Sequence, residues 1–349
     1  MTYKPVLGSA DDLPQVSLLI AARNEARNII RCLRSVAALD YPETKLLVLI
    51  GDDNSEDETA SLIRSFIADK PAFKLIHITA AQPGGKLQGK TNVLAQLAHR
   101  AQGDYLFYTD ADIALPSAWL KTMLAPLQAG AGIVTGVTVI EGNSLFYRFQ
   151  SLDWLTATSV ISLLAQIKVP VTAIGNNMAL RADAYNAVGG YEAIPFSLTE
   201  DHALFIAVLE KGYGFAHLFS SHVTALSTPQ PDLPAWFSQH KRWMYGAMQV
   251  HPLVRALFFG QFLTYPFCLV LAFFKPGIAL TLALCRYIPV TLYAATTALW
   301  LRQFKAAVAT FLYDPLFCIL YPILIIRYFT NRNISWKGRS YAGNEPIQE

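Results

Sequence analysis

The stretch "LLVLIGDDNSEDETASLI", residues 46–63, decides the fold. It begins with an apolar run at 46–51, which is typical of a strand buried on both faces in the centre of a parallel sheet. Acidic and amide side chains follow at once: Asp52, Asp53, Asn54, Glu56, Asp57 and Glu58. A strand does not need them, so they indicate either a solvated turn with a helix cap or a ligand site. Ser55, with Glu58 three residues later, predicts a capping box that opens a helix over 56–70.

The same strand–helix unit recurs on both sides of this stretch. Residues 14–30, "PQVSLLIAARNEARNII", read as a strand, a polar turn and a helix. Residues 73–79 predict a third strand, 89–101 a helix, and 104–113, "DYLFYTDADI", a fourth strand. This alternation predicts an α/β fold with a doubly wound, mostly parallel sheet, whose ligands bind beyond the carboxyl ends of the strands. Polar groups at three such ends favour a ligand site over solvated turns: Asn24, Glu25, Asp52, Asp53, Asp110 and Asp112.

The composition excludes several classes of protein. Of the 349 residues, 53% are hydrophobic and 15% are charged, against about 25% charged in typical soluble domains. A net charge of +3 does not indicate a nucleic-acid partner. None of the four cysteines forms a C-x-x-C pair, so neither a disulfide framework nor a zinc site is expected. Residues 1–14 have no apolar core and hence no signal peptide, which predicts that the polar part of the chain stays in the cytosol.

Asp110 and Asp112 form a D-x-D pair at the predicted end of the fourth strand. Carboxylate oxygens suit Mg²⁺ or Mn²⁺, and such ions keep positions open for phosphate oxygens. The pair therefore predicts a metal that neutralises charge growing on a diphosphate leaving group.

A glycine-rich segment, "PGGKLQGKTN" at 83–92, supplies backbone room and the cations Lys86 and Lys90. Residues 84–91 also match the G-x-x-x-x-G-K-[ST] spacing of an ATP-binding loop. Such a loop should follow the first strand, whereas this segment follows the third, so an ATPase is the less favoured interpretation.

Two later motifs each have a structural and a functional interpretation. Glu200 and Asp201 in "SLTEDHALF" stabilise a helix start or include a general base that takes a proton from a hydroxyl. "QHKRWMYG" at 239–246 is either a basic and aromatic patch beside a membrane or a substrate contact. In the second case Arg242 binds a diphosphate, and Trp243 stacks on a sugar or acceptor.

In chain order the motifs are "ARNE" at 22–25, "DDNSED" at 52–57, "GK" at 89–90, "DAD" at 110–112, "ED" at 200–201 and "QHKRW" at 239–243. Over residues 14–245 this set resembles the inverting family 2 glycosyltransferases of GT-A fold, in their membrane-attached bacterial branch. The later "WKGRSY" at 336–341 looks like the end of bacterial enzymes that glycosylate membrane lipids or pigments.

The resemblance implies a role for each matching residue. Glu25 and Asp53, with Asp52 beside them, resemble nucleotide contacts, and Lys90 resembles a phosphate contact. Asp110 and Asp112 match the metal-binding pair, with Asp110 also near the donor. Asp201 matches the catalytic base, and Glu200 lies beside it on the acceptor side with Asn176 and Asn177. Gln239, Arg242 and Trp243 match the Q-x-x-R-W motif that caps the donor site.

The resemblance also implies a reaction. A hexosyltransferase of this kind moves a sugar from a nucleotide-sugar, with a UDP-sugar favoured, to a membrane lipid hydroxyl in one displacement that inverts the anomeric centre. Two enzyme alternatives stay open: a processive polysaccharide synthase and a polyprenyl-phosphate glycosyltransferase. A non-catalytic membrane scaffold of the same fold is the third, although the intact acidic set argues against it.

The expected organisation is a cytosolic catalytic domain at 1–235, an interfacial helix at 236–255, membrane helices at 256–329 and a basic cytosolic tail at 330–349. Apolar runs at 257–274, 278–301 and 306–328 are each near the ~20 residues needed to span a bilayer; a buried helical core is the alternative. Arg286 inside the second run should face protein or headgroups. Residues 144–168 predict a long helix that is either a core helix or an interfacial one.

Basic residues in the tail favour the cytosol, which favours an even number of spans. The first run contains Pro266 and ends in "FKPG", so it is expected to be re-entrant or interfacial. The expected location is the inner or cell membrane, as a multi-pass protein that contacts the lipid bilayer and keeps its catalytic domain in the cytoplasm.

Overall fold

The computed structural model describes residues 12–79, 87–248 and 252–330, together with the short segments 333–336, 339–342 and 345–346. The chain divides into two compact units. The first unit contains Met1–Val139 and Val160–Thr228, and the second contains Ile140–Ser159 and Pro229–Glu349. Each unit is described by itself.

The first unit is built on a seven-stranded sheet with the strand order β3-β2-β1-β4-β8-β6-β9. Strands β1 to β4 are parallel to one another, β8 runs antiparallel to both β4 and β6, and β9 is parallel to β6. The strands are β1 (Val16–Ala22), β2 (Leu46–Asp52), β3 (Phe73–His77), β4 (Tyr105–Asp110), β6 (Ala131–Thr135), β8 (Asn177–Arg181) and β9 (Gly214–His217). Every residue of β2 is buried, as its apolar sequence predicts for a central strand. The predicted α/β fold with a mostly parallel sheet is confirmed.

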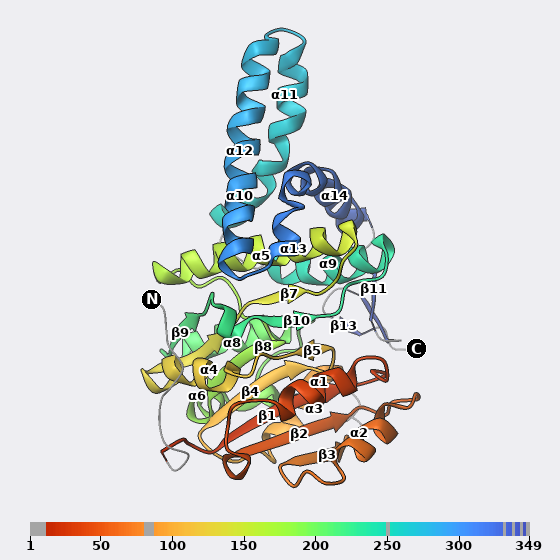
Figure 1. Ribbon diagram of the computed structural model, residues 1–349, viewed down its shortest axis with the longest axis vertical. Helices are drawn as coiled ribbons and strands as arrows, with labels where there is room; N and C mark the ends of the chain where they lie inside the picture. The colour runs from red at the N-terminus through yellow and green to blue at the C-terminus, as the bar shows by residue number, and fades with distance from the viewer. Residues whose placement is uncertain are drawn as a thin grey trace. The chain divides into compact units, whose positions relative to one another are not determined.

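Helices cover both faces of this sheet (Figure 1). One apolar core contains side chains of α1 (Ile29–Ala37), α2 (Thr59–Ile67) and α4 (Trp119–Gln128). The other contains side chains of α3 (Gly89–Ala98), α6 (Ala182–Val188), α7 (Gly190–Ala193) and α8 (Glu200–Glu210). A smaller sheet joins β5 (Ile113–Ala114), β10 (Ala225–Ser227) and β7 (Thr138–Ile140) in that order. The sheet edge where β1, β2 and β4 end is therefore held rigidly from both sides.

The start of α2 differs from the prediction. The helix begins at Thr59, and the Glu58 side chain makes no capping hydrogen bond. Ser55 Oγ instead accepts a hydrogen bond from the Asn24 backbone N–H at 3.0 Å, and Asp57 accepts one from the Thr59 N–H at 3.0 Å. The predicted capping box of Ser55 and Glu58 is wrong because Ser55 is used to join this loop to the loop after β1.

The second unit is helical apart from a three-stranded sheet of β11 (Asn333–Trp336), β12 (Arg339–Ala342) and β13 (Glu345–Pro346). The first part of α5 (Leu145–Gln166), the long helix predicted for 144–168, belongs to this unit. The other helices are α9 (Leu233–Ala247), α10 (Pro252–Gly260), α11 (Thr264–Ala272), α12 (Pro276–Trp300), α13 (Phe304–Ala307) and α14 (Thr310–Thr330). Helices α11 and α12 lie side by side as a hairpin (Figure 1).

Three helical segments in this unit are long and apolar enough to cross a membrane: Arg255–Ala272, Pro276–Trp300 and Thr310–Thr330. They coincide closely with the three predicted apolar runs. Large apolar side chains on them are open to the surroundings, and Phe273 at the turn between α11 and α12 is 88% exposed. A buried helical core therefore does not account for these segments.

Arg286 faces protein, as predicted for a charge inside an apolar helix. Its guanidinium lies 2.7 Å from Asp314 on α14, which is fully buried, and also donates to the Gln261 carbonyl at 3.1 Å. Tyr265 on α11 donates a hydrogen bond to the other oxygen of Asp314. One ion pair thus joins α11, α12 and α14.

A second buried polar group joins α5, α9 and α14. His240 Nε2 lies 2.8 Å from Asp153 Oδ2, and its Nδ1 lies 3.0 Å from the Trp236 carbonyl. Both ring nitrogens therefore have a polar partner inside the second unit. Tyr321 donates to Asp153 Oδ1 at 2.8 Å, and the Asp153 and His240 side chains are each 4% exposed.

We expect His240→Ala to lower the free energy of unfolding by about 3–5 kcal/mol, because it leaves the buried Asp153 side chain without its His240 partner. Thermal unfolding in detergent measures the change. His222→Ala is the control, since His222 is exposed and surface substitutions usually have small effects. Equal stability of the two variants would show that the Asp153–His240 pair contributes nothing.

Candidate active site

The carboxyl ends of β1, β2 and β4 lie at one edge of the sheet. Ala22 at the end of β1 pairs with Asp52 on β2, and Ala21 pairs with Asp110 on β4. The three acidic clusters that the sequence separates by tens of residues therefore meet at one place. This is the edge where doubly wound sheets bind ligands.

The predicted nucleotide contacts are mostly covered by protein. Asp52, Asp53 and Glu25 are 5%, 7% and 8% exposed. Arg23 donates to the Asp53 carbonyl at 2.9 Å and lies 3.8 Å from the Asp53 carboxylate. Glu25 Oε2 accepts from the Asn28 amide at 2.9 Å. These contacts hold the loops after β1 and β2 together and keep the carboxylates in fixed positions.

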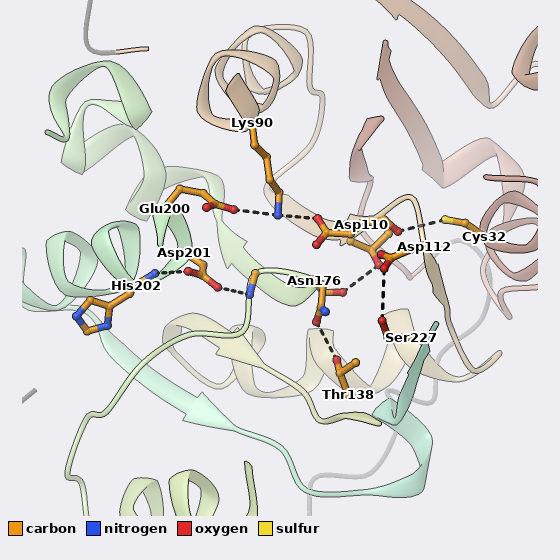
Figure 2. Close-up of polar contacts among 12 residues, drawn as sticks. Cys32, Lys90, Asp110, Asp112, Thr138, Asn176, Glu200, Asp201, His202 and Ser227 are labelled. Carbon is orange, nitrogen blue, oxygen red and sulfur yellow. Dashed lines mark hydrogen bonds and ion pairs between the residues drawn. The ribbon is translucent and has the colours of Figure 1, made fainter. Parts of the chain in front are cut away.

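Lys90, the second residue of α3, is the centre of the site (Figure 2). Its ammonium nitrogen lies 2.6 Å from Asp110 Oδ1 and 2.9 Å from Glu200 Oε1. Burial by itself would lower the pKa of Lys90, but the two carboxylates outweigh it and raise that pKa, so the side chain stays charged. Lys90 therefore joins the D-x-D pair at the end of β4 to the E-D pair at the start of α8.

Asp110 closes β4, and Asp112 follows in the turn before β5. Asp112 Oδ2 accepts a weak hydrogen bond from Ser227 Oγ at 3.4 Å, and the Asp110 carbonyl accepts one from Cys32 Sγ at 3.5 Å. The described residues hold no cluster of three or more His, Cys, Asp or Glu side chains placed for a metal. Two carboxylates nevertheless fit Mg²⁺ or Mn²⁺ bound together with a diphosphate, because such an ion takes one or two carboxylates and fills its remaining positions with phosphate oxygens and water. The ammonium group already resting on Asp110 shows that this position accommodates positive charge.

Glu200 is the first residue of α8, as expected for a helix-start acid, but its side chain also pairs with Lys90. Sequence reasoning placed it on the acceptor side without this contact. The pairing puts a buried carboxylate opposite Asp110, on the other side of one ammonium group.

Asp201 is held by backbone donors. Its Oδ2 accepts the Gly175 N–H at 2.7 Å, and its Oδ1 accepts the His202 N–H at 2.8 Å (Figure 2). Burial, and then the negative charge of Glu200, raise the pKa of Asp201 to about 6, against the opposing effects of Lys90 and the two N–H groups. A carboxylate with a pKa close to neutral is suited to general-base work.

Gly175 is a site residue that sequence reasoning missed. A side chain there would bring its Cβ to 2.8 Å from the Cβ of Asp201, closer than real contacts allow. Only glycine permits the Asp201 carboxylate to reach this backbone N–H. The glycine in "AIGNN" was a signal in the sequence, but nothing there connects it to a residue on α8.

Asn177 corrects a prediction, because it does not line the acceptor side. It is fully buried; its carbonyl oxygen accepts from Trp119 Nε1 at 2.7 Å, and its amide donates to the Val137 and Val223 carbonyls at 2.8 Å each. All of its polar groups are used inside the first unit. Asn176 is bound less extensively: its side-chain carbonyl accepts a hydrogen bond from the Thr138 hydroxyl at 2.8 Å.

The remaining predicted residues belong to the second unit or lie outside the described residues. Gln239, Arg242 and Trp243 are on α9 in the second unit, where the Trp243 ring meets the Trp154 ring edge-on with centroids 4.8 Å apart. Gly84, Gly85 and Lys86 of the glycine-rich segment lie outside the described residues. Gly89, with φ of 51°, opens α3 after β3, so this segment does not follow the first strand as an ATP-binding loop would.

Comparison with known proteins places this arrangement in a family. The family model described as "Glycosyl transferase family 21" matches residues 9–345. "Probable glycosyltransferase YdaM" of Bacillus subtilis is 28% identical over 257 residues, which is 71% of this chain and 59% of that protein. "Beta-monoglucosyldiacylglycerol synthase" of Synechocystis sp. is 28% identical over 249 residues, which is 68% of this chain and 48% of that protein. The chain thus spans about half the length of these relatives.

A solved structure is similar in fold. The mannosyltransferase PcManGT from Pyrobaculum calidifontis, solved in complex with GDP-Man and Mn²⁺, aligns with a TM-score of 0.58 at 18% identity, covering 91% of this chain and 89% of that one. At this identity the likeness concerns the fold, and it confirms the predicted GT-A class. The sequence motifs resemble family 2, whereas the matching family model describes family 21; both are glycosyltransferase families, so the prediction of a glycosyltransferase family is confirmed. The chain belongs to glycosyl transferase family 21.

Proposed function

We propose that this glycosyltransferase moves a hexose from a nucleotide-sugar donor, with a UDP-sugar favoured, to a hydroxyl of a membrane lipid, with inversion at the anomeric carbon. The observation that carries the proposal is the single ammonium group of Lys90 between Asp110 and Glu200, at 2.6 and 2.9 Å. This contact brings the sheet edge that is proposed to bind the diphosphate together with the start of α8, which carries the candidate base Asp201. The PcManGT structure, which holds GDP-Man and Mn²⁺, supports a nucleotide-sugar and a divalent metal as the ligands.

Asp110 and Asp112 would hold Mg²⁺ or Mn²⁺, which when bound neutralises charge on the departing diphosphate. Lys90 adds a cation at the same place. Glu200 orients the Lys90 side chain by pairing with it from the α8 side. Glu25, Asp52 and Asp53 line the end of the sheet where the nucleotide binds. Gln239, Arg242 and Trp243 stay assigned to the donor by their sequence motif.

Asp201 is the proposed base. Its carboxylate takes the proton of the acceptor hydroxyl, and the resulting oxygen attacks the anomeric carbon from the face opposite the diphosphate. A single attack from the opposite face inverts the configuration, as it does in inverting glycosidases. The two backbone N–H groups that hold Asp201 keep its oxygens in place during this step.

The proposed acceptor is a membrane lipid. Three apolar helical segments with largely exposed side chains supply a surface for a bilayer, and the Synechocystis relative is named as a synthase of a glucosyldiacylglycerol. We further propose that the chain crosses the cell membrane an even number of times, with the catalytic unit in the cytoplasm and the first apolar segment re-entrant or interfacial. Arg327 at the end of the third apolar segment, with Arg332, Lys337 and Arg339 after it in the sequence, fits a cytoplasmic tail. The loop between the second and third segments carries fewer cations, Arg302 and Lys305, as expected for the opposite side.

A processive polysaccharide synthase is the second candidate. The Q-x-x-R-W motif at 239–243 favours it, as does a 25% identical relative named "Poly-beta-1,6-N-acetyl-D-glucosamine synthase" from Staphylococcus epidermidis. Three apolar segments are few for a pore that exports a polymer, which favours the lipid glycosyltransferase.

The test is to incubate purified protein with a panel of nucleotide-sugars and a lipid extract, and to search for new products by mass spectrometry. A lipid that carries one added hexose supports the proposal. A polymer of repeating sugars would establish the synthase, and an added sugar on a polyprenyl phosphate would change the acceptor class. The double variant Asp110→Asn/Asp112→Asn is the inactive control. If the unsubstituted protein forms no product from any donor, the proposal is wrong and the non-catalytic membrane scaffold is the remaining interpretation.

We expect Trp243→Ala to reduce transfer by about 2- to 12-fold if its ring stacks on a substrate, since an aromatic contact is worth about 0.5–1.5 kcal/mol beyond area burial. In this structure the ring contacts Trp154 and His240 instead, with the His240 centroid 4.6 Å away. Trp154→Ala is therefore the matched control, because it removes the packing partner and keeps the Trp243 ring. Equal losses of activity and of thermal stability in both variants would assign Trp243 to packing alone.

A further inference from the structure

A small pocket lies beside Glu200 in the first unit. Its apolar walls include Ile194, Pro195, Phe196 and Ala203, and its polar lining includes Tyr191 and Glu200. The space suits a group about the size of one water molecule or one hydroxyl. No motif in the sequence pointed to it, because half of its lining comes from the connection between α7 and α8.

Tyr191 is the unusual residue of this pocket. The side chain is 3% exposed, and within the described residues its hydroxyl has no hydrogen-bond partner. A buried hydroxyl without a hydrogen-bond partner costs about 1–3 kcal/mol. We therefore expect a ligand or a water molecule to supply the missing partner. Burial raises the pKa of Tyr191 well above its usual value, and smaller contributions come from Tyr108 and then from Glu200, Tyr185 and Asp201. The hydroxyl therefore stays protonated as a donor and lies within electrostatic reach of the two acids that open α8.

In the proposed function the transferred sugar lies near this pocket. The metal on Asp110 and Asp112 would hold the diphosphate, and Asp201 would be the base, so the sugar would lie near the end of β4 and the start of α8. One ammonium group contacts both Asp110 and Glu200, so these two carboxylates lie close together on either side of the Lys90 nitrogen. Glu200 also lines the pocket, and a ring lying over Glu200 can direct one substituent into it.

We propose that the pocket binds one hydroxyl-bearing substituent of the transferred sugar, with the Tyr191 hydroxyl donating a hydrogen bond to that substituent's oxygen. This inference rests on the proposed function. The apolar walls fit the carbon that carries the hydroxyl, and the sugar hydroxyl donates a hydrogen bond to the Glu200 carboxylate. Tyr191 is then a specificity-determining residue: a donor that lacks the hydroxyl leaves buried polar groups unpaired, which is how such sites reject an analogue.

The test is a thermodynamic cycle between the protein hydroxyl and the sugar hydroxyls. Donor affinity is measured by calorimetry in the presence of Mn²⁺ for wild type and Tyr191→Phe. The ligands are the nucleotide-hexose that binds best and its 2-, 3-, 4- and 6-deoxy analogues. We expect one deoxy analogue to lose about 2- to 12-fold more affinity in wild type than in Tyr191→Phe, because the variant has already lost the hydrogen bond from Tyr191 and keeps only the one to Glu200. The other analogues should show equal losses in both proteins.

Tyr185→Phe is the matched control. The Tyr185 hydroxyl accepts the Tyr191 backbone N–H at 3.2 Å, and the two rings pack edge-on with centroids 5.9 Å apart. Tyr185 does not line the pocket, so its variant reports loss of packing around Tyr191 and should keep the wild-type pattern of deoxy losses.

If every deoxy analogue loses the same affinity in wild type and Tyr191→Phe, the pocket does not bind a sugar hydroxyl. The Tyr191 hydroxyl would then have a bound water as its hydrogen-bond partner. Normal binding of the parent donor in that experiment would leave the proposed function standing. Absence of binding by every nucleotide-sugar would overturn the proposed function and the pocket together.

Discussion

Asp201→Asn is expected to reduce sugar transfer by about 10²–10⁴-fold, the usual contribution of a general base. The amide is close to the carboxylate in size but cannot take the acceptor proton. Donor affinity should change little, because Lys90 and the metal on Asp110 and Asp112 would hold the diphosphate in the proposed site. Initial rates at saturating donor, together with calorimetric donor affinity, separate the two effects.

Two backbone N–H groups face the oxygens of Asp201, so the new amide nitrogen of Asp201→Asn meets one of them. Thermal unfolding of the variant must therefore accompany the rates. Glu200→Gln is the matched variant: it removes one of two carboxylates on Lys90 and should reduce transfer less than Asp201→Asn does. Normal transfer by Asp201→Asn with an inactive Glu200→Gln would make Glu200 the base. Activity in both would mean that the acceptor arrives already ionised, as a polyprenyl phosphate does.

The pH profile of transfer should follow the same carboxylate. Burial and the charge of Glu200 raise the pKa of Asp201 to about 6. Only the deprotonated form accepts a proton, so the rate should fall as the pH drops through about 6. In Glu200→Gln a negative neighbour is lost, the pKa of Asp201 falls, and the acidic limb of the profile should move to lower pH. An unchanged limb would show that another group titrates.

Removal of divalent metal is expected to abolish transfer, which is the second of the two largest effects. EDTA should stop the reaction, because it removes the ion that offsets charge on the departing diphosphate, and Mg²⁺ or Mn²⁺ should restore it. Asp110→Asn and Asp112→Asn should each weaken Mn²⁺ binding in the presence of nucleotide, measured by electron paramagnetic resonance without any turnover. Asp110→Asn also removes a charged partner of Lys90, so its effect on donor affinity should be the larger.

Asp40→Asn is the control for the metal experiment. Asp40 is an exposed carboxylate that pairs with Lys121 at 2.9 Å and belongs to no predicted motif. Its variant should bind Mn²⁺ as wild type does. Full activity in EDTA, or wild-type Mn²⁺ binding by both D-x-D variants, would remove the metal from the mechanism and leave Lys90 as the cation at this position.

Local sequence was sufficient for much of this molecule. Apolar runs such as 46–51, bounded by polar turn residues, are typical of buried strands, and alternation of strands with helices favours a mostly parallel, doubly wound sheet. In such a sheet the carboxyl ends of neighbouring strands meet, so the sequence alone placed Asp52 and Asp110 at one edge. The long apolar helices after residue 255 follow from length and composition in the same way.

Contacts between distant segments were decided only by the tertiary structure. Ser55 has the spacing of a capping residue, yet it bonds to Asn24, 31 positions away. Asn176 and Asn177 are adjacent and chemically identical, but Asn177 is used inside the first unit. Two contacts of the site join different elements: Lys90 pairs with Asp110 and Glu200, and the Gly175 N–H donates to Asp201. The surroundings of the Tyr191 hydroxyl, which has no hydrogen-bond partner among the described residues, also come from the completed fold. The physical reason is that periodicity and spacing report the path of the backbone over a few residues, whereas the direction of a polar side chain depends on which donors and acceptors the completed fold brings within about 3 Å of it.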